Sequence, residues 1–350
     1  MKLGLVVNNI ETESELYTTT QVAVTATNMG HEVWYISLKN MAYGLDGMVY
    51  AKARRVPDQK YLSHTVYLRK LKGSKAIEEK LIIDKLDILW LRNDPAEDGV
   101  NRPWAKFAGI DFGRIAMRHG VLVLNDPDGL CGADNKLYLQ YFPEKVRPRT
   151  IISQDPSDIK AFIHQEGGRA VLKPLSGSGG HNVFLIENES KANINQIIEA
   201  IATEGYVIAQ EYLPKAVFGD TRMFLLNGVP LVSKNKYAIM QRYRETGDED
   251  IRSNMSAGAG AKQAELTEDM LEIAETIRPK LMRDGMFFVG LDIVGNKLME
   301  INVFSPGGLH ECDQFEKCKF CPEIIYALER KLEYIKNYKR KFNNAEMAVL

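Results

Sequence analysis

Apolar residues in the first third of this chain form short runs that alternate with longer, mixed stretches. Runs within 3–7, 33–37, 87–92 and 121–125 are nearly continuous, which is typical of strands covered on both faces. The stretches 14–29 and 104–119 have helical length, and Gly30 and Gly120 stand where such helices would end. Strands that alternate with helices predict a parallel sheet. Residues 1–125 are therefore expected to form an open α/β domain, with a less regular insertion at 41–85.

Ligands of an open parallel sheet gather beyond the carboxyl ends of its strands. In this domain, polar residues follow those ends at Asn8, at Arg92–Pro95 and at Asn125–Pro127. Asn8, Arg92 and Asp94 are therefore candidate substrate-binding residues.

The rest of the chain mixes shorter strands and helices. Helices are expected at 132–141, which carries Lys136, and at 155–167, 191–203, 267–283 and 309–337. Strands are expected at 148–153, 170–173, 182–186 and 207–210, and hairpins at 222–233 and 289–304. This pattern predicts one lobe at 126–205, a second at 206–335 and a frayed basic tail at 336–350.

Composition narrows the class of protein. A length of 350 residues suggests two or three domains, and 45% apolar with 26% charged residues is ordinary for a soluble globular protein. The net charge of −1 gives no general attraction for nucleic acid or anionic membranes. The apolar run at the start is too short for a signal peptide, and none elsewhere approaches the length of a membrane span. Four cysteines do not suggest a disulfide framework, so a cytoplasmic protein with reduced thiols is expected.

The hairpin within 287–308 carries the first candidate chemistry. A two-residue loop would pair Leu291 with Glu300 and place Asp292 on the opposite face. A three-residue loop at 295–297 sets Asp292 across from Glu300, with Asn302 on the same face. The second register is preferred, because it gathers the apolar side chains on the other face. Facing carboxylates repel unless a cation lies between them, and hard oxygen ligands suit Mg²⁺ held with substrate phosphates. A solvated hairpin face is the alternative.

A glycine-rich segment lies between two predicted strands. The loop Ser176-Gly177-Ser178-Gly179-Gly180 precedes a strand, so it is neither a Walker loop nor a dinucleotide fingerprint. Its backbone N–H groups can approach an anion closely. Lys173 stands just before it in an apolar strand, where a buried ammonium needs a partner such as phosphate. Gln210 and Glu211 end another apolar strand and could face an adenine and a ribose. A plain turn and a solvated strand end are the alternatives.

The order of these motifs resembles the ATP-grasp superfamily: a lysine in a helix, then Lys-Pro-x-x-Gly-x-Gly-Gly, then Gln-Glu-Tyr-Leu, then Asp…Glu-x-Asn. More closely, the chain is similar to prokaryotic glutathione synthetases. That resemblance is carried by Leu172-Lys-Pro-Leu-x-Gly-x-Gly-Gly180, Gln210-x-Tyr-Leu-Pro214, Gly219-Asp-x-Arg222, Phe288-Val-Gly-Leu-Asp-Ile293, Glu300-Ile-Asn-Val303 and Ser305-Pro306. It covers nearly the whole chain. It implies an α/β N-terminal (pre-ATP-grasp) domain with an open parallel sheet, followed by an α+β, two-lobed ATP-grasp domain.

The resemblance also implies roles for individual residues. ATP would be bound by Lys136, Lys173, Ser176, Gly177, Ser178, Gly179, Gly180, Gln210, Glu211, Tyr212, Leu213 and Asp220. Magnesium, or manganese in its place, would be held by Asp292, Glu300 and Asn302. Arg222 and Arg252 would act at an acyl-phosphate centre, and substrates would contact Asn8, Arg92, Asp94, Asn254, Ser305, Pro306, Gly307 and Gly308. The implied partners are a peptide-like carboxylate and an amine, with no nucleic acid or membrane, in a homo-oligomer.

The implied reaction is amide formation through an acyl phosphate, with γ-glutamylcysteine and glycine as the leading substrates. Two departures from the family pattern keep other substrates open. Asn8-Asn9 replace the family's Asp-Pro pair, and Gly307-Gly308-Leu309-His310 replace the familiar continuation after Ser305-Pro306. A ligase for another peptide-like carboxylate and another amine is the runner-up, and an ATP-binding regulator without turnover is the third alternative.

One cluster lies outside the family pattern. His310, Cys312, Cys318 and Cys321 include a Cys-x2-Cys pair, which is the spacing of a zinc ligand pair. Only one close pair is present, so three thiols packed on a helix are the favoured alternative.

The segment 241–263 generates a testable prediction. It carries Arg242, Arg244 and Arg252 among Gly, Ser and Ala and has no apolar pattern, so it is expected to be weakly ordered without substrates and to close over the phosphates when they bind. Limited proteolysis should cut within it in the free protein, and ATP with both substrates should protect it. Cleavage that ignores the ligands would contradict this expectation.

Overall fold

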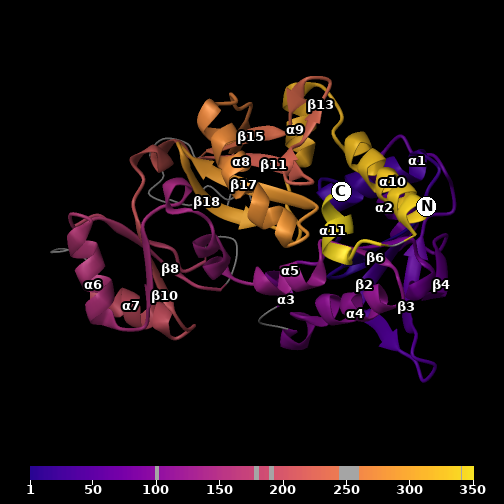
Figure 1. Ribbon diagram of the computed structural model, residues 1–350, viewed down its shortest axis with the longest axis horizontal. Helices are drawn as coiled ribbons and strands as arrows, with labels where there is room; N and C mark the ends of the chain where they lie inside the picture. The colour runs from indigo at the N-terminus through magenta and orange to yellow at the C-terminus, as the bar shows by residue number, and fades with distance from the viewer. Residues whose placement is uncertain (99–101, 177–180, 189–192, 244–259, 340) are drawn as a thin grey trace.

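The structure is a computed structural model, and it describes residues 1–98, 102–176, 181–188, 193–243, 260–339 and 341–350. Arg252, Asn254 and Gly177–Gly180 of the predicted site lie outside these ranges. The described residues form three large sheets, each covered by helices, and one two-stranded ribbon (Figure 1).

The N-terminal domain contains a six-stranded sheet. Its order is β4 (Ile77–Ile82), β3 (Val49–Arg55), β2 (Glu32–Tyr43), β1 (Lys2–Val7), β5 (Ile88–Leu91) and β6 (Leu122–Leu124). The predicted parallel arrangement is confirmed for β2, β1, β5 and β6. The insertion at 41–85 is more regular than expected, because β2 runs on to Tyr43 and β3 and β4 extend the sheet antiparallel.

Helices cover both faces of this sheet. On one face lie α1 (Thr18–Asn28) and α2 (His64–Lys72), together with α10 (Cys321–Tyr338), which returns from the far end of the chain. On the other face lies α4 (Ala108–Arg118), followed by α5 (Pro127–Gly132). The continuous apolar runs of β1 and β5 are buried on both faces for this reason.

A second lobe contains the four-stranded sheet β7 (Thr150–Ser153), β10 (Val207–Glu211), β8 (Ala170–Pro174) and β9 (Phe184–Ile186). Helices α6 (Pro156–Gln165) and α7 (Ile194–Ala202) pack their isoleucines against one face and form a core separate from the rest of the molecule. Figure 1 shows this lobe projecting to the left of the molecule. Since β10 pairs with both β7 and β8, the small sheet extends beyond residue 205.

The third sheet runs β16 (Gly260–Lys262), β15 (Ile239–Tyr243), β11 (Asp220–Leu226), β17 (Phe288–Val294) and β18 (Lys297–Asn302), with β12 (Val229–Pro230) beside β11. Two short strands, β13 (Val232–Ser233) and β14 (Lys236–Tyr237), form a separate ribbon. Helix α8 (Glu268–Arg283) covers one face. The pairing of β15 with β16 corrects the expectation that 241–263 is irregular throughout, and 244–259 lie outside the described residues.

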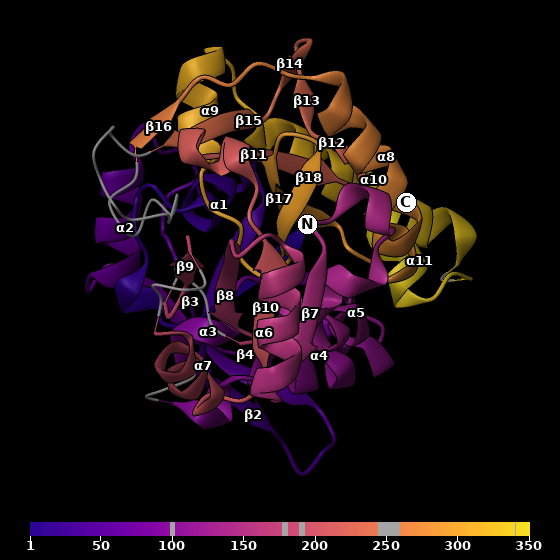
Figure 2. The same cartoon turned by 90° about the vertical axis from the view of Figure 1, so that its left-hand side faces the viewer.

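The opposite face of the third sheet packs against the N-terminal domain. Trp90 on β5 contacts the rings of Phe287 and Phe288 edge-on, with centroids 5.3 and 6.0 Å away. Asn125, which follows β6, donates to the carbonyls of Phe288 and Val303 and accepts from the Phe288 N–H. The Asn125 side chain therefore links the N-terminal domain to the third sheet, and both its amide nitrogen and its amide oxygen are hydrogen-bonded. In Figure 2 the third sheet, with β11, β17 and β18, lies above α6, β7 and β10 of the smaller lobe.

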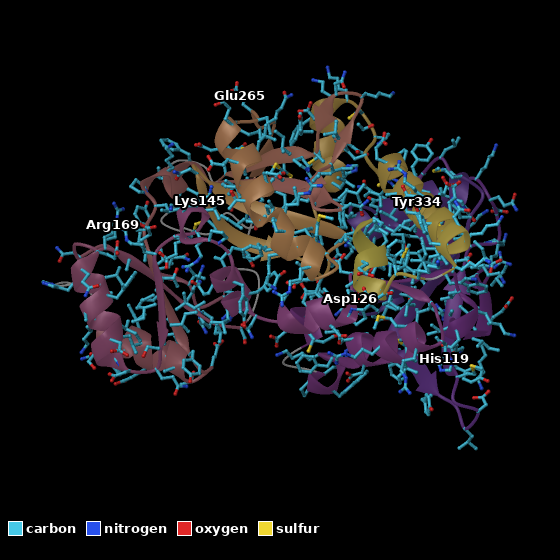
Figure 3. All side chains as sticks on the ribbon, in the orientation of Figure 1. His119, Asp126, Lys145, Arg169, Glu265 and Tyr334 are labelled. Carbon is cyan, nitrogen blue, oxygen red and sulfur yellow. The ribbon has the colours of Figure 1, made fainter. Side chains whose placement is uncertain are left out.

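The basic tail is not frayed. After α9 (Leu309–Glu316) and α10, helix α11 (Asn344–Val349) begins with a capping box formed by Asn343 and Glu346 and buries Met347. Asn344 donates to Asp126, whose position at the join between domains is labelled in Figure 3. The tail contains several basic residues, but its apolar residues 347–349 are buried and α11 packs beside β6 and α8.

Candidate functional site

A cleft lies where the three sheets meet. It gathers residues from the loop after β5, the turn around 136, strands β8 and β10, and β18 with the loop that follows. Seven of the predicted site residues line it: Asp94, Lys136, Lys173, Gln210, Glu300, Asn302 and Ser305. These residues are up to 211 positions apart in sequence, since the first is 94 and the last is 305.

Two half-buried lysines, Lys136 and Lys173, line this cleft. Lys173 lies on the face of β8 opposite the lobe's core, and its Nζ donates to Gln210 Oε1 at 3.0 Å. Burial lowers the pKa of Lys173 to about 8, Glu300 partly offsets this, and neighbouring Lys136 lowers the pKa further. Burial also lowers the pKa of Lys136. Lys136 was expected on a helix over 132–141, but α5 ends at Gly132 and residues 136–141 form a 3-10 turn after the cap residue Asn135.

The hairpin β17–β18 places Asp292 directly opposite Glu300, as predicted, but by a different route. Val294 pairs with Lys297, so the loop has two residues rather than three. The register then shifts by one, because Ile293 pairs with Leu298 and Asp292 with Glu300, which leaves Met299 as a β-bulge. The bulge restores the facing carboxylates that the shorter loop would have separated.

The pKa values of Asp292 and Glu300 are shifted in opposite directions. Burial alone would raise the pKa of Asp292, but the guanidinium groups of Arg222 and Arg242 hold it below its usual range. Burial and the charge of Asp292 raise the pKa of Glu300, and the two lysines oppose that rise. Glu300 makes no hydrogen bond or ion pair with another residue in the described ranges, so its carboxylate is the available anion in the cleft.

An arginine that sequence analysis did not assign to the site completes this network. Arg222 binds both oxygens of Asp292, at 2.5 and 2.8 Å. Arg242 makes two bonds to Asp220, at 2.7 and 2.8 Å, and also lies 2.8 Å from Asp292. The apolar pair Ile239 and Met240 was the missed signal, since it begins a strand that runs on through Arg242 and pairs Arg242 with Asp220.

The candidate substrate-binding residues largely hold one another. Asn8 donates to the Asp94 carbonyl and to Asp98, and its Oδ1 accepts from the Asp94 N–H. This fixes the loop after β5 beside the cleft, where burial raises the pKa of Asp94.

The loop after β18 is held between two arginines. Arg92 donates to the carbonyls of Phe304 and Pro306, and Arg222 donates to that of Gly307. Gly308 precedes α9 as its N-cap with φ +105°, and a Cβ there would meet the Met240 side chain. Of the residues that replace the familiar continuation, Gly308 is thus favoured by the backbone conformation.

The other predicted nucleotide contacts are placed differently from Gln210. Glu211 accepts from the Arg149 backbone N–H and pairs with its guanidinium, and Arg169 lies 3.9 Å over the Tyr212 ring. Neither Glu211 nor Tyr212 is among the residues that line the cleft. Leu213 and Ser176 each lie two residues beyond the end of a strand, β10 and β8 respectively.

The cysteine cluster does not form a metal site in the described ranges. Cys312, Cys318 and Cys321 are buried in the apolar core beside α1 and α10, and burial raises the pKa of each thiol. Over the same ranges, no three His, Cys, Asp or Glu side chains gather as a metal group. A cation at Asp292 and Glu300 would therefore need the Asn302 amide and ligands from the substrate.

Comparisons with known proteins match this organisation. The N-terminal domain model of prokaryotic glutathione synthetases matches residues 1–131, and the family's ATP-grasp domain model matches 135–317. The chain is 40% identical to the glutathione synthetase of Thermosynechococcus vestitus over 68% of this chain and 70% of that protein. It is 29% identical to the glutathione synthetase of Nostoc sp., over 95% of this chain and 99% of that one.

Solved structures show the same fold at low identity. ATP-grasp ligase PsnB has a TM-score of 0.59 at 14% identity, over 94% of this chain and 99% of that one. D-alanyl-alanine synthetase A from Vibrio cholerae has a TM-score of 0.55 at 13% identity, over 95% of this chain and 98% of that one.

Fold and cleft together define an ATP-grasp enzyme, an ATP-dependent ligase that forms amide bonds from small-molecule substrates. Within that class, the chain belongs to the prokaryotic glutathione synthetase family. Across its described ranges, no helix is both long enough and apolar enough to cross a membrane.

The arginine network generates a stability prediction. Arg242→Gln removes the bidentate bonds to Asp220 and one partner of buried Asp292, so the free energy of unfolding should fall by about 3 kcal/mol. Urea denaturation measures the change, and Lys262→Gln on neighbouring β16 should change it little because Lys262 is exposed. In the double variant Asp220→Asn/Arg242→Gln the loss should be smaller than the sum of the single losses. Additive losses would show that these two groups are not coupled.

Proposed function

We propose that this chain is a glutathione synthetase, which joins the cysteine carboxylate of γ-glutamylcysteine to the amine of glycine with ATP as the phosphoryl donor. One observation carries the proposal: two half-buried lysines and a half-buried glutamate that makes no hydrogen bond to any described residue share a cleft between the ATP-grasp lobes and the carboxyl edge of the N-terminal sheet. The relative that is 40% identical supports the choice of substrates.

The chemistry explains why such a cleft needs so many charges. A free carboxylate does not react with an amine at a useful rate, and transfer of the γ-phosphoryl group to it creates an acyl phosphate with a good leaving group. No covalent protein nucleophile is needed. The protein must stabilise the oxygens of the transferring phosphoryl group and position the amine. Lys136 and Lys173 would contact the phosphates, and Arg222 would lie at the acyl-phosphate centre.

A divalent cation fits the facing carboxylates. Asp292 and Glu300 are cross-strand neighbours whose like charges destabilise one another, and Asn302 donates its amide to Asp292 from the same strand as Glu300. Carboxylate and amide oxygens suit Mg²⁺, and Mn²⁺ would accept the same donors. Bound there, the ion would neutralise charge on the nucleotide phosphates. Because Arg222 and Arg242 already bind Asp292, Glu300 would carry the larger share of ion binding.

The remaining assignments stay proposals that rest on the family's motifs. Gln210 would face the nucleotide from the cleft, with Glu211, Tyr212 and Leu213 beside it and Asp220 acting through Arg242. The loop 176–180 would cover the phosphates, and Arg252 and Asn254 would approach from 244–259. Asn8, Asp94 and the loop 305–308 would shape the substrate end. Reduced thiols and the use of ATP favour the cytoplasm, and a homo-oligomer is proposed from the family resemblance.

A panel assay tests the substrate assignment. Phosphate release from ATP is measured with several peptide-like carboxylates, each combined with several amines. Turnover confined to γ-glutamylcysteine with glycine is the expected result. Faster turnover with a different pair would make the chain a related ligase, and ATP binding without turnover on any pair would indicate a regulator.

Lys173 provides a test of the nucleotide site. Lys173→Met keeps the apolar stem but loses the charge, so ATP affinity should fall about 30-fold. Since the pKa of Lys173 is about 8, wild-type affinity should also decline as the pH rises past 8, and this decline should be absent in Lys173→Met. Calorimetry measures both effects, with Lys160→Met on α6 as the control. Equal ATP affinity in Lys173→Met and the wild type would remove Lys173 from the site.

Glu300 provides a test of the metal site. Glu300→Gln keeps the size of the side chain but removes the unpartnered charge, so Mg²⁺-dependent turnover should fall about 100-fold. The melting temperature without nucleotide should stay the same or rise, because the repulsion from Asp292 is relieved. Glu265→Gln, at the exposed position labelled in Figure 3, is the matched control. Wild-type turnover in Glu300→Gln would end the assignment.

A further inference from the structure

The lysine turn, which is the 3-10 turn Lys136–Tyr141, lies in the segment that joins α5 to the first strand of the small lobe. The backbone N–H of Lys136 donates to the carbonyl of Leu175, just after β8 of that lobe, at 3.1 Å. Hydrogen bonds within a 3-10 turn have poorer geometry than those of an α-helix, and runs longer than four residues are uncommon. The position of the lysine turn therefore depends on contacts outside it.

Tyr138 makes the contact between the lysine turn and the large lobe, which contains the third sheet. Tyr138 is 4% exposed, and its ring packs edge-on against that of Phe142, with centroids 5.2 Å apart. Its hydroxyl donates to Asp284 Oδ2 at 2.7 Å. Asp284 is the C-cap of α8, the helix that covers one face of the third sheet, so this hydrogen bond ties the lysine turn to the large lobe.

The accepting carboxylate is itself held in place. Lys280, one turn earlier on α8, forms an ion pair with the same Oδ2 atom of Asp284. The Lys280 ammonium also lies 5.1 Å from the centre of the Tyr138 ring and 5.2 Å from that of Tyr141. The backbone here is closely packed, because a Cβ at Gly129 of α5 would overlap the Asp284 carbonyl oxygen. Asp284 is therefore fixed between α8 and the N-terminal domain.

The lysine turn is thus attached at one end to the small lobe and in its middle to the large one. Lys136 and Tyr138 both line the cleft. We propose that Tyr138 is a positioning residue. Its hydrogen bond to Asp284 holds Lys136 at a set distance from the hairpin β17–β18, where the nucleotide phosphates would bind. This inference rests on the proposed function for the role of Lys136 as a phosphate contact, but not for the identity of the carboxylate and the amine.

The hydroxyl of Tyr138, rather than its ring, carries this role. The aromatic neighbours of the ring, Tyr141 and Phe142, belong to the same segment of chain, so they cannot fix the turn relative to the large lobe. A phenylalanine at position 138 would keep both neighbours and fill the same space. It would lack only the directed bond to Asp284, and with it the restraint on Lys136.

The charges in the cleft explain why the position of Lys136 matters. Lys136 and Glu300 act on each other across the cleft, and each opposes the effect of burial on the pKa of the other. Because the Lys136 N–H is bonded to Leu175, the lysine would follow the small lobe if nothing else held it. The Tyr138 hydroxyl keeps the Lys136 ammonium beside Glu300 instead, which is where a polyphosphate with its cation would lie.

The test measures the affinities for ATP and for adenosine by calorimetry on the full chain. Tyr138→Phe should bind ATP about fivefold more weakly, because the hydrogen bond that aligns Lys136 is lost. It should bind adenosine, which has no phosphate, within about twofold of the wild type.

Tyr141→Phe is the matched control. Tyr141 lies on the same turn and beside the same Lys280 ammonium, but it is 63% exposed and its hydroxyl makes no hydrogen bond within the described ranges. Tyr141→Phe should bind both ligands as the wild type does.

Two further measurements separate positioning from a general structural effect. Lys136→Met should bind ATP at least about tenfold more weakly than the wild type. Adding Tyr138→Phe should then change the ATP affinity by less than about twofold, because no ammonium is left to align. At the other end of the bond, Asp284→Ala should reproduce the loss seen in Tyr138→Phe. Asp284→Asn should keep the ATP affinity within about threefold of the wild type, since its amide oxygen can still accept from the hydroxyl.

The outcomes distinguish the positioning role from the proposed function. Unchanged ATP affinity in Tyr138→Phe, equal losses of ATP and adenosine affinity, or additive losses in the double variant each overturn the positioning role, even if the wild type makes glutathione. Wild-type ATP affinity in Lys136→Met removes Lys136 from the nucleotide site and overturns the positioning role with it. A loss confined to ATP, in a chain whose wild type makes no glutathione, sustains the positioning role and overturns the proposed substrates. Should Tyr138→Phe fail to fold, equal ATP affinity in Asp284→Ala and Asp284→Asn overturns the positioning role, and a loss in Asp284→Ala alone sustains it.

Discussion

The close approach of two carboxylates, those of buried Asp292 and half-buried Glu300, is the constraint on which the cleft depends. Like charges at a cross-strand position destabilise a hairpin, and burial makes each charge more costly. Neighbouring positive charges stabilise the two carboxylates to different extents. Asp292 is neutralised by two arginines from neighbouring strands, whereas Glu300 is only partly balanced by two lysines whose own charges burial disfavours. The result is a site with fixed positive groups and one poorly compensated anion, which is suited to a cation and polyphosphate arriving together.

Arginines also connect this hairpin to the N-terminal domain. Arg92 and Arg222 hold the carbonyls of the loop 304–307 from opposite sides, and Asn125 binds the backbone of β17 and of Val303. The end of β18, which carries Glu300 and Asn302, is therefore positioned by residues from two domains. This arrangement ties the proposed metal ligands to the carboxyl edge of the N-terminal sheet.

Much of this organisation could be predicted from sequence, because periodicity and turn residues are local signals. The parallel strands, the hairpin at 227–228 and the facing of Asp292 and Glu300 all follow from such signals. The bulge at Met299 could not be predicted, since loop length and bulge are two ways to obtain one register and only the packing selects between them. Arg242 was missed because its strand is short and lies at the edge of a polar segment. Helix α11 was missed because docking is decided by distant residues on β6 and α8.

The separate core of the small lobe has a consequence for motion. The N-terminal domain and the large lobe share two continuous apolar cores, while the sheet β7–β10–β8–β9 and its helices enclose a third that excludes residues from either. Local opening is least costly where few apolar contacts cross a boundary. The molecule therefore has two parts with separate apolar cores, and Lys173 and Gln210 are carried by the small one. Rotation of that lobe would widen or narrow the cleft without disturbing the bond network around Asp292, so nucleotide could enter and leave while the acidic centre keeps its geometry.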